Sequence, residues 1–282
     1  MTEMTLTVLA ITLGLPLAAA ALAATAGRAL PGVTPGSATA AGILLGALAG
    51  QVAIGAAPRF PPAGAVDKLP WLALSGIALA AVHQHFTQAV WQPYILPAGI
   101  ALGIVWVGWP RLAIPDTAAW LAALTVWGGS IWVLRRLDGL RPTRSTVIAA
   151  SVAVALSGVA VYSSSYSMAQ LVAVSLAALL GAVVAGRGSF GIPARMALAG
   201  PLIGLLTMLA LYTTAAPLAL LLLLAIPLAP GIAERVEMQI WPATPRGAPT
   251  SARHLLVLGA VALLPAIAAI AVAQSNSGPL YY

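Results

Sequence analysis

The sequence predicts an all-α integral membrane protein with about ten transmembrane helices, and its composition is the first reason. Of the 282 residues, 61% are hydrophobic and 7% are charged, and the mean hydropathy is +0.99. A soluble domain carries roughly 25% charged residues, so this chain could not cover a water-facing surface. Its apolar runs, such as Leu220–Leu224, do not alternate with polar residues as the strands of a membrane barrel would. Helices are therefore expected throughout one polytopic domain that spans residues 1–282.

Ten apolar runs, bounded by proline, glycine or charge, are the candidate spans. Each approaches the roughly 20 residues that a helix needs to cross a bilayer. The runs lie at residues 4–26, 37–57, 69–90, 93–109, 117–134, 145–162, 166–186, 194–213, 215–231 and 254–273. The first run is too long for the core of a signal peptide and follows no basic residue, so we expect it to be retained as a helix.

The basic residues predict how these helices lie across the membrane. With the amino terminus outside, the connections that face the cytoplasm hold ten of the thirteen Lys and Arg residues. Arg59, Lys68 and Arg111 then face outside. Because cytoplasmic loops are enriched in Lys and Arg, both termini are expected to be extracytoplasmic, in the inner membrane of a cell. Topology thus explains the net charge of +7, and no nucleic acid is expected as a partner.

The two halves of the chain, residues 1–140 and 141–282, are candidates for an internal repeat. Gly76 and Gly200 are separated by 124 residues, and so are Pro93 and Pro217. This offset pairs the third span with the eighth and the fourth with the ninth. A five-helix unit crosses the membrane an odd number of times, so its two copies would be inverted. Inverted repeats are a recurrent plan of secondary transporters.

Glycines spaced four residues apart predict close helix packing. They occur at Gly42, Gly46 and Gly50 in the second span, and again at Gly99 and Gly103 in the fourth. Such spacing leaves a flat groove into which another helix fits. We expect these faces to pack within the bundle, with contact between copies of the chain or with partners in a membrane complex as the alternative.

One polar stretch stands out in spans that otherwise contain few polar residues. Gln84, His85 and Gln88 share one arc of roughly 100° on a helix. Under the 124-residue offset, Thr207 and Tyr212 are the counterparts of residues in the same stretch. Hydroxyls, amides and aromatic rings can hold a neutral solute in a membrane, so these five residues are the candidate substrate-binding site.

Two other roles remain open for the polar stretch. Gln and His side chains near a membrane interface also hold neighbouring helices together by hydrogen bonds. Alternatively, His83 or His85 is an axial ligand of haem or chlorophyll, since His is a usual haem ligand. The two rings point about 160° apart on a helix, so they cannot chelate one metal ion. Beyond the haem or chlorophyll alternative, no cofactor and no metal are expected.

Several enzyme classes lack their signatures in this chain. There is no cysteine, and no P-loop, GxGxxG, HExxH or GxSxG motif occurs. No Asp, Glu or Lys falls clearly within a span, which argues against a carboxylate-based pump and against acid–base catalysis. The chain is not expected to be an enzyme, and no catalytic residue is assigned.

The plan of ten short helices within 282 residues is similar to that of the drug/metabolite transporter superfamily. Residues 120–136 loosely resemble a span of that family, but they occur one position too early in the order of spans. The termini expected outside also differ from the family's usual inside termini. The resemblance is one of layout, and it assigns a role to no residue.

Two functions remain after these exclusions. The first is a secondary transporter or facilitator for a small neutral or amphipathic solute, held between the two repeats. The alternative is a non-catalytic integral subunit of a larger membrane protein complex, associated with a pigment or haem. The polar stretch favours the transporter, because ionisable and amide groups within membrane spans commonly mark solute sites.

Overall fold

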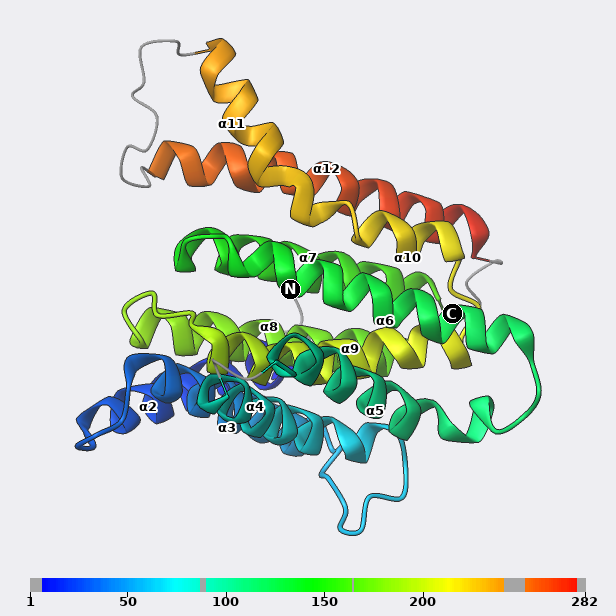
Figure 1. The fold of residues 1–282 in the computed structure, drawn as a ribbon, viewed down its shortest axis with the longest axis horizontal. Helices are drawn as coiled ribbons and strands as arrows, with labels where there is room; N and C mark the ends of the chain where they lie inside the picture. Colours follow the sequence, from blue (N-terminus) through cyan, green and yellow to red (C-terminus); the bar gives the residue numbers. More distant parts are fainter. Residues whose placement is uncertain (1–6, 87–89, 164, 241–251, 278–282) are drawn as a thin grey trace.

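The computed structural model describes residues 7–86, 90–163, 165–240 and 252–277, and the regular structure in these ranges is entirely helical (Figure 1). Near the start of the described chain, a π-helical turn, η1 (Ala10–Gly14), leads directly into α2 (Leu15–Ala29). The later elements, in chain order, are α3 (Pro35–Ala53), η2 (Val66–Lys68), α4 (Leu69–His85), α5 (Gln92–Leu112), α6 (Thr117–Asp138), α7 (Pro142–Tyr162), α8 (Tyr166–Ala185), α9 (Ile192–Tyr212), α10 (Pro217–Leu223), η3 (Ile226–Leu228), α11 (Ala229–Ile240) and α12 (Ala252–Asn276).

Nine helices within the described ranges are long and apolar enough to cross a membrane, as in an all-α multi-pass membrane protein. The third expected span, residues 69–90, is shorter in the structure. Its helix α4 has 17 residues and ends at His85, where the apolar run gives way to polar side chains. At about 1.5 Å per residue it is some 25 Å long, a little less than the apolar thickness of a bilayer.

Prolines and short polar side chains set the helix boundaries. Proline occupies the first turn of α3, α5, α7, α9 and α10, where its missing N–H would have no helical partner in any case. At the start of α3, the Thr34 hydroxyl accepts a hydrogen bond from the Ser37 N–H at 3.2 Å. At the start of α6, the Asp116 carboxylate accepts one from the Ala118 N–H at 2.9 Å. Both contacts satisfy backbone donors that a helix leaves free.

The ninth span differs from the single helix expected over residues 215–231. It continues to Ile240 and is broken into α10, the short turn η3 and α11. Pro227 lies inside η3 and Pro230 near the start of α11. A proline lacks the N–H for the bond to the residue four before it and disfavours helical geometry at its predecessor. Two prolines three residues apart therefore interrupt the helix at this point.

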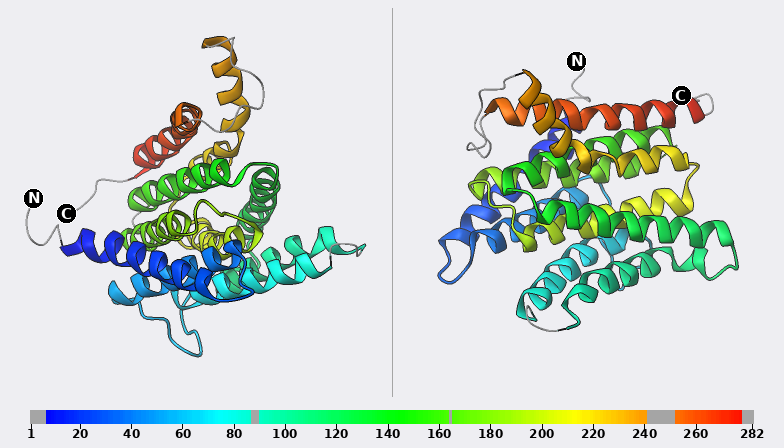
Figure 2. Two further views of the ribbon diagram at one scale, coloured as in Figure 1. Left: turned by 90° about the vertical axis from the view of Figure 1, so that its left-hand side faces the viewer. Right: turned by 45° about the horizontal axis from the view of Figure 1, so that its top comes forward.

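Helix α9 lies at the centre of the bundle. It contacts α3, α4, α5, α6, α7 and α8. In the most apolar stretch of α8 and of α9, 61% of the residues are buried, against 22% in the first and last spans. Figure 1 shows α12 at one side and α2 and α3 at the other, with α7, α8 and α9 between them. In Figure 2, α4 and α5 form a hairpin that projects sideways from this stack.

The glycine spacing in the second span is used within the bundle, as expected. A Cβ added at Gly46 would lie 2.7 Å from the Pro16 carbonyl oxygen of α2 and 3.0 Å from the Ala178 Cβ of α8. Gly42 and Gly50 meet the same two helices. The absence of side chains along this face lets three backbones approach closely, and dispersion contacts replace the hydrophobic drive that lipid does not supply.

The central pair α4 and α9 shares a reciprocal glycine contact. A Cβ at Gly76 of α4 would overlap the carbonyl oxygen of Met196 in α9. A Cβ at Gly200 of α9 would overlap the carbonyl oxygen of Leu72 in α4. Since residue numbers rise in opposite directions along this contact, the two helices are antiparallel.

Polar contacts gather the arginine-bearing helix ends at one end of the bundle, called the basic end below. The Arg28 guanidinium donates to the Ala185 carbonyl at 2.7 Å and so joins the ends of α2 and α8. Three further contacts join α6, α7, α9, α11 and α12, namely Arg195–Asp138 at 2.5 Å, Arg144–Glu234 at 2.5 Å and His254–Glu237 at 2.6 Å. The connections expected to face the cytoplasm thus lie together, at the opposite end from the Arg111–Asp116 ion pair.

Candidate functional site

The structure disperses the residues of the predicted substrate site. Gln84 and His85 are exposed at the end of α4, and Gln88 lies outside the described residues. Thr207 is fully buried in α9, where its hydroxyl donates to the Ile203 carbonyl at 2.7 Å. Tyr212 is at the end of α9, and its hydroxyl donates to the Val107 carbonyl of α5 at 3.3 Å.

The antiparallel packing of α4 and α9 explains why these residues do not face one another. Leu72 meets Gly200, so residues beyond Gly200, such as Thr207, lie toward the start of α4. His85 is at the other end of α4, about 20 Å along the helix from Leu72. In an antiparallel pair, residue numbers rise in opposite directions. Two residues separated by a constant number of positions therefore face each other only where the two helices cross. The expected wall of His85 and Gln84 opposite Thr207 and Tyr212 is therefore not formed.

The two histidines of the polar stretch have different surroundings. The His85 ring is exposed and packs against Phe86, with ring centroids 5.0 Å apart. The Nδ1 atom of His83 is buried and has no hydrogen-bond partner within the described ranges. Neither histidine lines a cavity that the structure describes between the helices.

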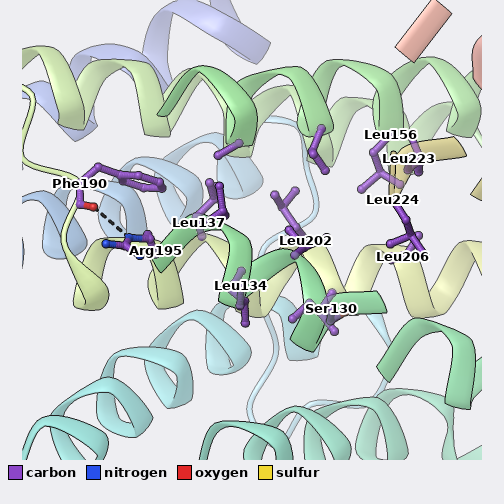
Figure 3. Close-up of a pocket in the computed structure, with 16 residues that line it drawn as sticks. Ser130, Leu134, Leu137, Leu156, Phe190, Arg195, Leu202, Leu206, Leu223 and Leu224 are labelled. Atoms are coloured by element: carbon purple, nitrogen blue, oxygen red, sulfur yellow. Dashed lines mark hydrogen bonds between the residues drawn. The ribbon is translucent and has the colours of Figure 1, made fainter. Parts of the chain in front are cut away.

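A narrow cavity between α6, α7, α9 and α10 is the better candidate for a binding site, and we call it the leucine slot. Its volume is about 90 Å³. Its lining from α9 runs from Arg195 to Leu206, a stretch of twelve residues that rises about 16 Å along the axis. The lining residues are Ser130, Val133, Leu134, Leu137, Ala149, Val152, Leu156, Phe190, Arg195, Leu198, Ala199, Leu202, Ile203, Leu206, Leu223 and Leu224. Figure 3 shows Arg195 and Phe190 at one end and Leu223 and Leu224 at the other.

The sequence folds around the slot for identifiable local reasons. On α9 the lining residues recur at intervals of three and four, so they form one helical face. The break after α10 brings Leu224 against Gly129 of α6, where a Cβ would lie 2.7 Å from a Leu224 methyl carbon. Gly129 thus provides the space in which the broken span approaches α6, next to Ser130.

Arg195 closes the slot at the basic end. Its side chain is 11% exposed, its Nε donates to the Phe190 carbonyl at 3.1 Å, and its Nη1 pairs with Asp138 at 2.5 Å. Asp138 is the last residue of α6, and its side chain is 52% exposed. The arginine is therefore held from inside the protein by a carbonyl and from the aqueous rim by a carboxylate. In the sequence, Arg195 is one of the ten basic residues in the connections expected to face the cytoplasm, and no local pattern distinguishes it.

Ser130 is the other polar group of the slot, and its hydroxyl is unusual for this bundle. It is 6% exposed and has no hydrogen-bond partner within the part of the chain that the structure describes. Most other buried hydroxyls donate to a carbonyl, which lies eight residues earlier for Ser145 and four residues earlier for Thr39, Thr146, Ser151, Ser163, Ser175 and Thr207. The Ser130 oxygen is not among the fully enclosed atoms that lack a partner, so part of its surface remains accessible, and its position beside the cavity makes it available to a bound molecule.

A second cavity, here the glycine cavity, lies between α4, α5 and α9. Its volume is about 460 Å³, and it is lined by five glycines together with Leu72, Ser75, Leu79, Ile100, Leu102, Trp106, Met196 and Ile203. The Ser75 hydroxyl already donates to the Leu72 carbonyl at 3.1 Å. No charged side chain lines this cavity, so it offers space without a group that would select a ligand. Ile203 of α9 lines both cavities and separates them.

Metal chemistry gains no support from side-chain clusters in the described ranges, where no three His, Asp or Glu residues are grouped to hold an ion. The slot instead combines an apolar wall, one unpaired hydroxyl and one arginine, which suits non-covalent binding of a molecule with few polar groups. No known protein family matches the chain, and no curated protein is significantly similar to it.

Proposed function

We propose that the protein is a secondary carrier or facilitator for a small neutral or amphipathic solute, and that the leucine slot is its binding site. The observation that carries the proposal is the Ser130 hydroxyl, which has no hydrogen-bond partner among the described residues and lies in a cavity whose lining is apolar apart from Ser130 and Arg195. A purely structural serine in a membrane helix would bond to its own backbone, as Ser151 does. A solute that accepts or donates one hydrogen bond would satisfy Ser130.

The broken ninth span supports the same proposal. Substrate sites in transporters commonly lie beside discontinuous helices, because the break frees backbone N–H and C=O groups that a continuous helix uses in its own hydrogen bonds. Here Leu223 and Leu224, at the end of α10, line the slot directly before the break. The slot also takes its lining from α6 in the first half of the chain and from α7, α9 and α10 in the second.

The proposal includes two inverted five-helix repeats. The 124-residue offset relates Leu72 to Met196 and Gly76 to Gly200. The Gly76–Met196 contact thus has the Gly200–Leu72 contact as its counterpart. Such reciprocity is expected where a two-fold axis in the membrane plane passes between α4 and α9. The broken ninth span has the continuous α5 as its counterpart, so the copies have diverged beside the slot.

The proposed orientation has the basic end in the cytoplasm. Arginine-rich connections face the cytoplasm in most membrane proteins, and the basic end carries Arg28, Arg144 and Arg195. With ten crossings, counting α4, both termini are then extracytoplasmic, in the inner membrane of a cell.

Solute flux in proteoliposomes tests the carrier proposal. Purified protein would be screened with neutral and amphipathic solutes, and any transported solute would then be measured with Ser130→Ala and with Ser151→Ala as the matched control. Ser130→Ala is expected to reduce uptake several-fold, whereas Ser151→Ala and His85→Ala leave it unchanged. Equal flux in wild type and Ser130→Ala would remove the slot from the mechanism, and no flux of any solute would contradict a carrier.

The alternative proposal, a subunit of a larger complex, draws on the α4–α5 hairpin. This hairpin projects from the bundle in Figure 2 and carries His83, whose buried Nδ1 has no hydrogen-bond partner among the residues that the structure describes. A pigment or haem bound through His83 would give the purified assembly a visible absorption band, and His83→Ala would abolish it. A colourless protein that purifies as a single species would contradict this role.

A further inference from the structure

We propose that Gln51 and Ser175 hold one buried water molecule in a small cavity between α3, α4, α8 and α9. This cavity, called the axial cavity below, takes its lining from residues between 44 and 51, between 69 and 73 and between 171 and 175, and from Pro201. Among the described residues, it shares none of its lining with the leucine slot or the glycine cavity. The water site is therefore additional to the proposed transport site and does not depend on it.

The axial cavity has room for one water molecule. Its volume is about 20 Å³, and about 10–15 Å³ is enough to hold a water. Gln51 and Ser175 are the polar side chains in its lining, and the other lining side chains are apolar. A buried water forms about two to four hydrogen bonds with polar groups, so these two side chains can supply the partners that it needs.

Gln51 supplies an acceptor that has no donor. The residue is 4% exposed and lies near the end of α3. Its Nε2 donates to the Val66 carbonyl at 3.1 Å, and Pro70 cannot donate to that carbonyl because proline has no N–H. The amide is thus oriented with Oε1 as its acceptor, and Oε1 has no hydrogen-bond partner within the described ranges. This atom is not fully enclosed by the protein, as expected beside a cavity, so a donor there would satisfy it.

Ser175 supplies the second acceptor. The residue is 4% exposed, and its hydroxyl donates to the Leu171 carbonyl at 2.9 Å. Because the hydroxyl hydrogen is used in that bond, Oγ can only accept a second one. The two side chains therefore offer two acceptors to the cavity. A water molecule matches them, because it can donate one hydrogen bond to each.

A cation is a poorer match for the same two oxygens. No charged side chain from the described part of the chain lines the axial cavity. An ion that is buried without an opposite charge loses its hydration at a large cost. A neutral water loses much less when it is immobilised between two acceptors. The lining thus favours water over a metal cation.

The site joins the two halves of the chain. Helices α3 and α8 are antiparallel and meet at Gly50, where a Cβ would lie 2.5 Å from a Val174 methyl carbon. Gln51 and Ser175 follow these two residues and, like them, are separated by 124 positions, the offset of the proposed repeat. A single water beside this crossing would donate one hydrogen bond to the same position in each half.

High-resolution crystallography or cryo-EM of the wild-type protein in lipid tests the site directly. We expect one density peak within about 2.5–3.0 Å of both Gln51 Oε1 and Ser175 Oγ. The peak should persist when choline replaces sodium and potassium in every buffer. It should be lost in Gln51→Met, which has a side chain of similar length without the acceptor. A cavity without a peak, or a peak that is lost when the metal cations are removed, would overturn the proposal.

Thermal unfolding of variants gives a second test. Ser175→Ala removes an acceptor of the water together with a bond inside α8, whereas Ser151→Ala removes a bond of the same kind inside α7. Ser175→Ala should therefore lower the melting temperature more than Ser151→Ala does. In a Gln51→Met background, where the water is already lost, the two serine substitutions should have the same effect. An unchanged effect of Ser175→Ala in that background would mean that no water couples the two residues. If Gln51→Met does not fold, the density in the wild-type protein decides.

Discussion

At the scale of single residues, the polar groups that matter are those whose hydrogen bonds are incomplete. Ser130 and Ser151 are both serines in membrane helices, and nothing in their type distinguishes them in the sequence. Ser151 donates to the Val147 carbonyl at 2.9 Å, whereas Ser130 lines the slot and has no hydrogen-bond partner within the described part of the chain. A hydroxyl that faces an apolar cavity without a hydrogen bond destabilises the empty protein.

Replacing Ser130 should therefore stabilise the ligand-free protein. Ser130→Ala removes the unpaired hydroxyl, and the expected gain is about 1 kcal/mol in the free energy of unfolding. Ser151→Ala removes a hydroxyl that donates to a carbonyl of its own helix. This substitution should change the free energy of unfolding little. Thermal unfolding in detergent would compare the two. A loss of stability in Ser130→Ala would show that the hydroxyl has a partner in the folded protein.

Asp67 organises the connection between α3 and α4. Its carboxylate accepts hydrogen bonds from the Gly64 N–H at 2.9 Å and the Arg59 N–H at 3.4 Å. The bond from Gly64 lowers the pKa of Asp67 below its ordinary value of 3.8. A depressed pKa in the folded state means that the carboxylate stabilises this loop above about pH 4. That contribution is lost as the pH falls through the lowered pKa.

Hydrogen exchange at the Gly64 amide would report this dependence on pH. The protection factor should be constant from pH 7 to pH 5 and fall below pH 4 as the carboxylate takes up its proton. Asp67→Ala should have low protection at every pH, because the acceptor is missing. Protection in that variant equal to the wild type would mean that another group holds the loop.

The candidate site shows which residue roles a sequence can and cannot reveal. The stretch from His83 to Gln88 is visible because it is polar among apolar residues. Arg195 is visible only as a positive charge in a loop, and Ser130 as one serine among many. Their role depends on α6 and α9, whose facing residues are more than 50 positions apart, so no local pattern contains it. An offset of 124 residues matched Thr207 to His83, but antiparallel helices separate that pair.

At the scale of helices, proline and glycine decide the architecture. Helix starts were largely predictable, because proline opens many of the spans and the apolar runs end near charges. The break in the ninth span was missed, since its residues are as apolar as those of an unbroken helix. Pro227 and Pro230 were the available signal. Glycine spacing correctly indicated close packing, but only the folded chain shows which helix each glycine meets.

The reciprocal glycines of α4 and α9 make a quantitative prediction. Gly76→Ala and Gly200→Ala each place a Cβ against a backbone carbonyl, which cannot move without its helix. Each variant should lose about 1–3 kcal/mol of stability through overpacking. The double variant should lose less than the two added together, because separating the helices once accommodates both methyl groups.

Gly128 is the matched control for these two variants. It lies within α6, and a Cβ there would meet no atom within 4 Å. Gly128→Ala should leave stability unchanged or raise it by about 0.5–1 kcal/mol, since alanine has less conformational freedom to lose on folding. Thermal unfolding of the wild type and the four variants in one detergent would measure the differences. A Gly128→Ala variant destabilised as much as the other two would show that the loss does not come from the close crossing of α4 and α9, because alanine favours a helix more than glycine does.

At the scale of the whole molecule, charge and hydropathy define one axis. The all-helical, multi-pass plan follows from composition alone. A protein whose interior and surface are both apolar must lie in lipid, where helices satisfy the backbone hydrogen bonds. Successive connections lie at alternate ends of the bundle, so the arginine-bearing connections are expected at the same end. The order in which the helices surround α9 does not follow from either property. It depends on which side-chain faces interdigitate, and many arrangements of apolar helices satisfy the same hydropathy profile.

The axis of the molecule can be tested directly, because the chain contains no cysteine and single cysteines can be introduced without a background. Ala63 is exposed in the connection before α4, and Gly139 is exposed between α6 and α7 at the basic end. A Cβ at Gly139 would come no closer than 3.8 Å to the Arg136 carbonyl oxygen, so Gly139→Cys should be tolerated.

With the basic end in the cytoplasm, a membrane-impermeant maleimide added to intact cells should label Ala63→Cys and leave Gly139→Cys unmodified. After the membrane is permeabilised, the maleimide should label both introduced cysteines. Labelling of Gly139→Cys alone in intact cells would reverse the orientation, and labelling of both would place two opposite ends of the bundle on one side and contradict the spanning layout itself.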